Sequence, residues 1–150
     1  MADDSLMDAL TRRRGEPRAQ AAPATEPDEP TLPEPDAPYL PHSKPLARPV
    51  YTLHLLLGRD GCRSFQLVHL DSDSTFTADD AGQCIRLRFC GSKVMQVSIR
   101  GRNLRRLYDL IHQHRIAWVM RQELGRDFAA EGETVITEIH TEEPVPNRTV

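Results

Sequence analysis

The stretch CIRLRFCGSKVMQVSI, residues 84–99, decides the fold, because hydrophobic side chains alternate on both sides of a short turn that contains glycine. Alternation with a period of two is typical of a strand that buries one face. Matching the two hydrophobic faces leaves residues 91–93 as a three-residue turn, a length that commonly carries a bulge. The predicted cross-strand pairs are Phe89 with Met95, Leu87 with Val97 and Ile85 with Ile99.

A second hairpin is predicted upstream, over residues 50–57 and 63–70. The hydrophobic odd positions are Tyr51, Leu53, Leu55 and Leu57 in the first segment and Phe65 and Leu67 in the second. Gly58-Arg59-Asp60-Gly61 between the segments is a turn signal. Keeping the hydrophobic faces together requires a five-residue connection over 58–62 or a bulge. The predicted pairs are Leu55 with Phe65 and Leu53 with Leu67, and His69 is expected opposite Tyr51 at the margin of the core. Residues 71–75 are then a polar loop that joins the two hairpins.

One helix is expected after the central hairpin. Asn103 is a favoured N-cap residue, and hydrophobic residues follow it at helical spacing. Residues 116–120 are then predicted to be a strand, because Ile-Ala-Trp-Val is better strand than helix material. The alternative is one continuous helix over 103–124, capped by Gly125. Residues 134–140 alternate in the manner of a further strand.

These elements predict an α+β fold: a small, mostly antiparallel sheet of two hairpins and two further strands, with one helix over a face. Proline marks the boundaries, because it removes a backbone hydrogen-bond donor. Ten of the twelve prolines lie within 17–49, and the other two are Pro144 and Pro146. We therefore expect a disordered arm rich in proline, alanine and acids over 1–49, a single domain over 50–143 and a flexible tail over 144–150.

The number of cysteines indicates the redox environment in which the protein is expected to lie. Three cysteines, an odd number, in a chain with no apolar signal segment or membrane-spanning run favour a reducing, cytoplasmic location without membrane contact. Neither these cysteines nor the six histidines have the spacing of a metal or redox motif, so we expect no metal and no cofactor. Each thiol is expected to be structural and buried or half-buried.

Basic residues are concentrated between positions 86 and 121, where nine Lys and Arg residues accompany one acidic residue, Asp109. Three of the arginines belong to the polar face of the central hairpin, and others lie near the start of the helix. Such a patch suits phosphates or an acidic protein surface. The candidate contact residues are Arg86, Arg88, Arg100, Arg102, Arg105 and Arg106. Acidic stretches over 71–80 and 123–143 flank this patch and are candidates for neutralising it.

The stretch LVHLDSDST, residues 67–75, resembles the first motif of haloacid-dehalogenase-like phosphatases over these nine residues. The resemblance implies Asp71 as nucleophile, Asp73 as general acid/base and a magnesium ion that neutralises the substrate phosphate. It also implies a parallel α/β sheet with a downstream lysine and an acidic pair. The chain departs from that pattern, because the only later lysine is Lys93 on the predicted turn.

A small domain without a constellation of catalytic groups predicts a non-enzymatic binding or adaptor module whose partner is another protein. The first alternative is an accessory protein that binds nucleic acid through the arginine-rich face. The second alternative is magnesium-dependent, phosphatase-like activity at Asp71 and Asp73. The sequence as a whole indicates no particular oligomeric state.

Overall fold

The computed structural model describes residues 31–34, 36–123 and 130–145. Most of the predicted arm, residues 146–150 of the predicted tail and Gly125 lie outside these residues. The elements in chain order are β1 (Thr52–Leu56), the 3₁₀ turn η1 (Gly58–Asp60), β2 (Cys62–Gln66), the 3₁₀ turn η2 (Leu67–His69), β3 (Thr75–Asp79), β4 (Gly82–Cys90), β5 (Val94–Arg102), α2 (Arg105–His112), β6 (Trp118–Met120) and β7 (Val135–Glu142).

These elements confirm the α+β class, but the prediction of a single sheet was wrong. The strands form two sheets, with the orders β2-β1-β6 and β3-β4-β5-β7. All named pairings are antiparallel except that of β1 with β6, which is parallel. The β6 strand follows α2, so the chain crosses back to the first hairpin instead of extending the larger sheet.

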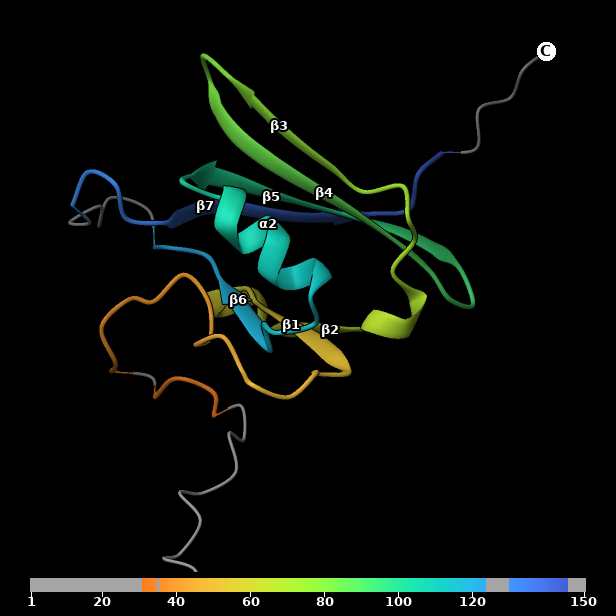
Figure 1. Cartoon of the computed structure of the whole chain (residues 1–150), viewed down its shortest axis with the longest axis horizontal. Coiled ribbons are helices and arrows are strands. Elements are labelled where there is room, and N and C mark those ends of the chain that lie inside the picture. Colours follow the sequence, from red (N-terminus) through yellow and green to blue (C-terminus); the bar gives the residue numbers. More distant parts are fainter. Residues whose placement is uncertain (1–30, 35, 124–129, 146–150) are drawn as a thin grey trace, which may run out of the picture.

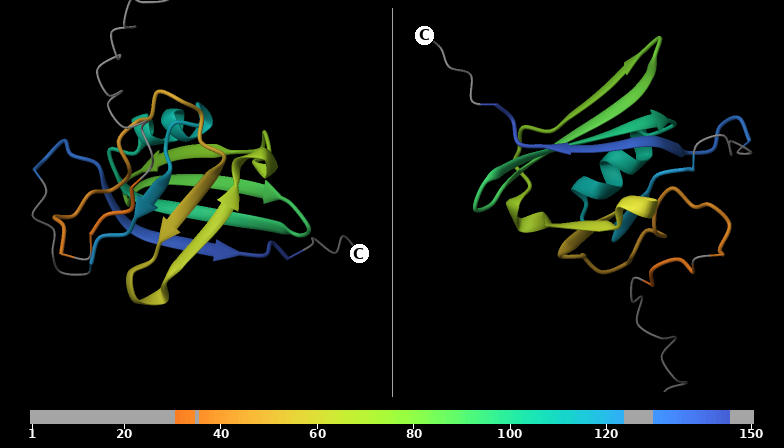
Figure 2. Two further views of the ribbon diagram at one scale, coloured as in Figure 1. Left: turned by 90° about the horizontal axis from the view of Figure 1, so that it is seen from below. Right: turned by 180° about the vertical axis from the view of Figure 1, so that it is seen from behind.

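One hydrophobic core lies between the sheets, and α2 lies between them along one side (Figure 1). The strands of the smaller sheet run across those of the larger one, as the view from below shows (Figure 2). Side chains of both sheets and of α2 meet in this core, among them Leu53, Leu55, Leu87, Ile99, Leu107 and Ile111. The larger sheet therefore has one buried face and one outer face, which is turned away from α2 and the smaller sheet.

The central hairpin forms as predicted. All three predicted pairs are present in the register of β4 with β5, and residues 91–93 connect the two strands. Ile85, Leu87 and Ile99 are fully buried, whereas Arg86 and Arg88 at the alternate positions of β4 are exposed. The period of two in the sequence therefore identifies the buried face of the larger sheet correctly.

The upstream hairpin forms in a different register from the predicted one. Leu53 pairs with Phe65 and Leu55 with Arg63, a displacement of two residues. The turn closes earlier, because the Leu57 N–H donates to the Gly61 carbonyl at 2.8 Å and Gly61 adopts a φ of 84°. An even displacement keeps the same face inward, so Leu53 and Leu55 are still fully buried.

The ends of this hairpin also differ from the prediction. Leu67 leaves the strand in η2 and is buried there, with its N–H donating to the Tyr51 carbonyl at 2.8 Å. The Tyr51 side chain, predicted to face inward, is 85% exposed. His69 is exposed as well and lies beside Gly91, so its predicted place at the core margin opposite Tyr51 was wrong.

The β3 strand was not predicted, because residues 71–75 were interpreted as a loop between two hairpins and the pattern after them is weak. Phe76 is the only large hydrophobic residue in Thr75–Asp79, and it packs half-buried against the core. β3 pairs with β4 from Thr75 opposite Arg86 to Asp79 opposite Gly82. On the other side of the sheet β7 pairs with β5, which confirms the strand predicted over 134–140.

The helix is short, so the prediction of a strand after it is confirmed and the continuous helix over 103–124 is excluded. Asn103 is not its N-cap: its φ is 54°, and its side chain donates to the Glu133 carbonyl at 2.8 Å. The buried Leu104 precedes the first helical residue, and its N–H donates to the Gln83 side chain of β4 at 2.6 Å. A side chain from the neighbouring sheet thus satisfies the backbone donor of the residue that precedes the helix, and no local side chain caps the helix start.

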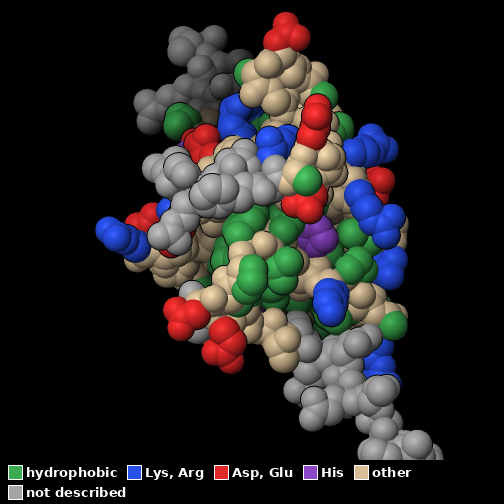
Figure 3. Space-filling model, turned by 90° about the vertical axis from the view of Figure 1, so that its left-hand side faces the viewer, with side chains coloured by type: hydrophobic (Ala, Val, Ile, Leu, Met, Phe, Trp, Pro, Cys, Tyr) green, Lys and Arg blue, Asp and Glu red, His purple; other side chains and the backbone are tan. Residues whose placement is uncertain are grey.

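Residues 39–46, here called the strap, lie against β6. The Ser43 N–H donates to the Trp118 carbonyl at 3.0 Å, and the Met120 N–H donates to the Pro41 carbonyl at 2.8 Å. Ser43 and Leu46 are buried. The disordered arm was predicted to extend to residue 49, but its last part is bound to the fold. Backbone groups at the edge of β6 form hydrogen bonds with the strap. Figure 3 shows the molecule from the left-hand side of Figure 1, with hydrophobic side chains near the centre of the view and several Lys and Arg side chains along one margin.

Candidate partner-binding site

The outer face of the larger sheet carries half of the arginines predicted to contact a partner. Arg86 and Arg88 project from β4, and Arg100 projects from β5. Arg86 lies opposite Thr75 of β3 and Ser98 of β5, and Arg100 lies opposite Cys84 and Glu138. All three arginines are exposed. They are held side by side because the strand register places successive alternate residues on one face.

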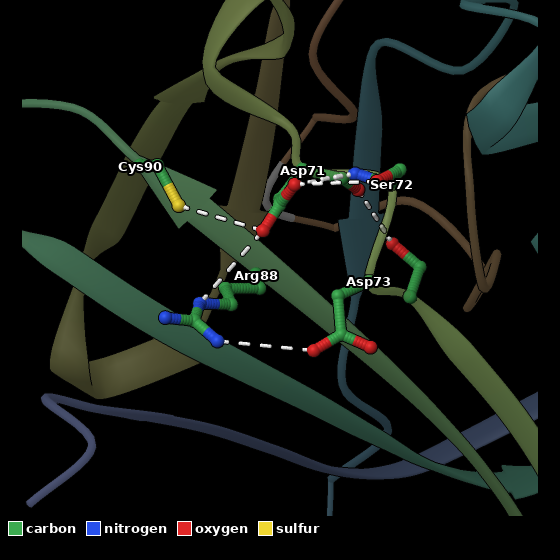
Figure 4. A network of polar contacts seen from close by, with 6 residues as sticks. Asp71, Ser72, Asp73, Arg88 and Cys90 are labelled. Carbon is green, nitrogen blue, oxygen red and sulfur yellow. Dashed lines mark hydrogen bonds and ion pairs between the residues drawn. The ribbon is translucent and has the colours of Figure 1, made fainter. Parts of the chain in front are cut away.

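Acidic residues neutralise Arg88 at one end of this face. The Arg88 Nε lies 3.9 Å from the Asp71 carboxylate, and its Nη1 lies 3.8 Å from the Asp73 carboxylate (Figure 4). The Asp71 N–H donates to the Arg88 carbonyl at 2.8 Å, which holds the acidic loop against β4. The Cys90 thiol donates to Asp71 at 3.8 Å. The acidic stretch that flanks the patch in sequence therefore does neutralise part of it.

The β7 edge of the same face is also acidic. Glu138, His140 and Glu142 lie opposite Arg100, Ser98 and Gln96 of β5 respectively. His140 Nε2 lies 3.5 Å from the Glu142 carboxylate. Within the described part of the chain, neither Arg86 nor Arg100 has a carboxylate within ion-pair distance. The outer face therefore has two available guanidinium groups between acidic margins.

The other candidate arginines lie elsewhere. Arg105 and Arg106 belong to α2, on the opposite side of the sheet from the outer face. Arg105 forms an ion pair with Asp109 at 3.6 Å, and its guanidinium lies 5.6 Å from the Phe76 ring centre. Arg102, at the end of β5, is half-buried. The six predicted residues therefore do not form one continuous surface.

Asp71 and Asp73 lie in a context unlike that of a phosphatase. The loop that carries them follows η2 and leads into an antiparallel sheet, whereas the motif needs a parallel one. Within the described ranges, no group of three or more His, Cys, Asp or Glu side chains is arranged to hold a metal ion. Both carboxylates instead pair with Arg88, a contact that the sequence interpretation missed.

The three cysteines do not share one environment. Cys84 is buried, as expected, but Cys62 and Cys90 are exposed, which corrects the expectation that every thiol is at least half-buried. Cys62 begins the edge strand β2, and Cys90 ends β4 on its outer face, so both positions leave the sulfur at the surface.

The chain matches no protein-family model, no curated protein and no solved structure. No helix among the described residues is long and apolar enough to cross a membrane.

Proposed function

We propose that the protein is a non-enzymatic binding module whose outer face contacts another protein. The observation that carries this proposal is the distribution of charge on that face. Arg86 and Arg100 have no carboxylate partner among the described residues, and acidic side chains lie on both sides of them. A surface with both signs suits a partner with complementary charges, because like-charge contacts reject other partners.

The same charge distribution argues against nucleic acid as the partner. A polyanion gains affinity from cations that neutralise its phosphates and release counterions. On the outer face, Asp71 and Asp73 already pair with Arg88, while Glu138 and Glu142 on β7 would repel phosphates. The arginines of α2 cannot compensate, because they lie on the other side of the sheet.

Site-specific photo-crosslinking of the full chain tests this proposal. A photoreactive residue at Thr75, which is exposed and lies opposite Arg86, is expected to capture a second protein from cells that express the chain. The same residue at Arg59, which is exposed in the turn η1 of the other sheet, is the matched control and should not capture that protein. Equal capture from both positions would contradict the proposal.

A titration with single-stranded and duplex nucleic acid, in low and moderate salt, separates the main alternative. The proposal predicts no salt-dependent binding of nucleic acid. If nucleic acid bound, if that binding weakened as salt was added, and if an Arg86→Gln/Arg100→Gln variant lost it, the outer face would be a nucleic-acid site and the proposal would be wrong.

A further inference from the structure

A second candidate site lies on the inner side of the larger sheet, between β2 and the turn of the central hairpin. It is an open cleft of about 300 Å³, lined by β2, η2 and the residues around the turn 91–93. That volume is at the lower end of the range for ligand sites. The cleft shares no lining residue with the arginine row of the outer face.

The floor of the cleft is apolar and rigid. Phe65 of β2 and Phe89 of β4 stack with their ring centres 4.7 Å apart and an angle of 23° between planes. Phe89 and Met95 are almost fully buried, while Phe65 is half-buried and presents part of its ring to the cleft. Because this floor belongs to the β1–β2 and β4–β5 pairings, it is formed before any ligand arrives.

The rim of the cleft is cationic. Arg63 lies with its guanidinium 5.5 Å from the Phe65 ring centre, and it is held there by a hydrogen bond of 2.9 Å to the Thr141 hydroxyl. Lys93 lies on the turn, and its side chain is 59% exposed. His69 is exposed beside Gly91 on the same rim. The described residues that line the cleft include no Asp or Glu.

A carboxylate of the chain itself already occupies the cationic rim. The Lys93 ammonium donates to the Glu143 carboxylate at 2.6 Å. The pKa of Glu143 is lowered, first by this hydrogen bond and then by the charge of Lys93, and Arg63 adds a smaller effect. The carboxylate thus lies in the field of both cations. Both side chains of the pair are more than half exposed, and such ion pairs are weak, so another carboxylate can displace Glu143 at little cost.

We propose that this cleft binds a short acidic peptide segment, with a carboxylate held by Lys93 and Arg63 and a neighbouring apolar side chain on the floor of Phe65, Phe89 and Met95. The chain's own sequence around Glu143 has this chemistry, because Pro144 and the exposed Val145 follow the acidic residue. Glu143 therefore acts as an internal competitor for the peptide. The inference is independent of the outer face and of its partner.

The test uses the capped peptide TEEPV, the sequence of residues 141–145, and a control peptide TQQPV of the same size without the carboxylates. Binding is followed by NMR through the backbone amide shifts of residues 63–66 and 91–95 in the full chain. The Glu143→Gln variant is expected to bind TEEPV about two- to fivefold more tightly than the parent, because the internal competitor is gone. Adding Lys93→Gln to that variant should abolish the shifts at these amides.

The chain offers a matched control for Lys93, because its only other lysine is Lys44, which is exposed on the strap. Glu143→Gln with Lys44→Gln loses the same charge and should bind TEEPV as the single variant does. The proposal is overturned if TQQPV shifts the same amides as strongly, if the two lysine replacements have equal effects, or if millimolar TEEPV shifts none of them. Folded ¹H–¹⁵N spectra of every variant before titration exclude misfolding as the cause.

Discussion

Gly101 lies at the irregularity in the pairing of β5 with β7. A Cβ atom at this position would lie 1.9 Å from the Val135 carbonyl oxygen, and because that neighbour is backbone, no side-chain rotation relieves the clash. We expect Gly101→Ala to lower the free energy of unfolding by about 1–3 kcal/mol, as overpacking does. Urea unfolding measures this change. Gly91→Ala is the control, because its Cβ would make an ordinary contact of 3.5 Å with His69, and equal losses in both variants would contradict the account.

Tyr39 makes the contact that joins the strap to both sheets. Its hydroxyl donates to the Met120 carbonyl of β6 at 3.0 Å and accepts a hydrogen bond from the Ile136 N–H of β7 at 3.0 Å. Tyr39→Phe leaves the amide of a fully buried residue without this acceptor, so we expect a loss of about 1–3 kcal/mol in urea unfolding. Tyr51→Phe removes a hydroxyl from a side chain that is 85% exposed and should have no measurable effect. Similar stability of the two variants would contradict a stabilising role of the Tyr39 hydroxyl.

At the scale of the element, the strap is also expected to respond to pH through His42. Burial is the main cause that lowers the pKa of His42 below 6.5. The hydrogen bond to the Ser43 carbonyl raises this pKa in part, and the positive charge of Arg106 on α2 lowers it further. The folded state therefore favours the neutral imidazole, and the unfolded chain binds more protons once the pH falls below about 6.5. The stability that the neutral His42 contributes is therefore fully present above about pH 6.5. It is lost as the pH falls from there through the lowered pKa of His42 in the folded state.

The measurement is the free energy of unfolding at several pH values from 7.5 to 5.5, in the parent and in a His42→Gln variant. The parent should lose more stability over this range than the variant. An identical pH dependence in both chains would exclude His42 as the source.

The sequence predicts those elements whose structure is determined by residues close together in the chain. Regular alternation in β4 and β5 identified their register, because buried hydrophobic residues occupy every second position and most of the residues between them are polar. The register of the upstream hairpin depended on where its turn closes, which the Leu57–Gly61 hydrogen bond decides. β3 was missed because Phe76 is its only large hydrophobic residue.

At the scale of the whole molecule, the parts that could not be predicted depend on contacts between distant segments. The strap pairs with a strand more than 70 residues later in the chain, as in the hydrogen bond from the Ser43 N–H to the Trp118 carbonyl. The candidate arginines form one cluster in sequence, but helix and sheet geometry divides them between two sides of the larger sheet. The Arg88 contacts with Asp71 and Asp73 likewise arise only when the loop folds back on β4. The sequence composition gives the number of these charged residues but does not indicate which of them form ion pairs.

The most direct test of the central claim is the affinity of an Arg86→Gln/Arg100→Gln variant for the protein captured through Thr75. The account predicts a loss of about tenfold or more, because two charged contacts at one interface are removed. The control variant Arg48→Gln/Arg59→Gln loses the same charge from exposed positions away from the outer face and should keep its affinity within about twofold. Equal affinities of the two variants for that protein would contradict the claim that the outer face is the binding surface.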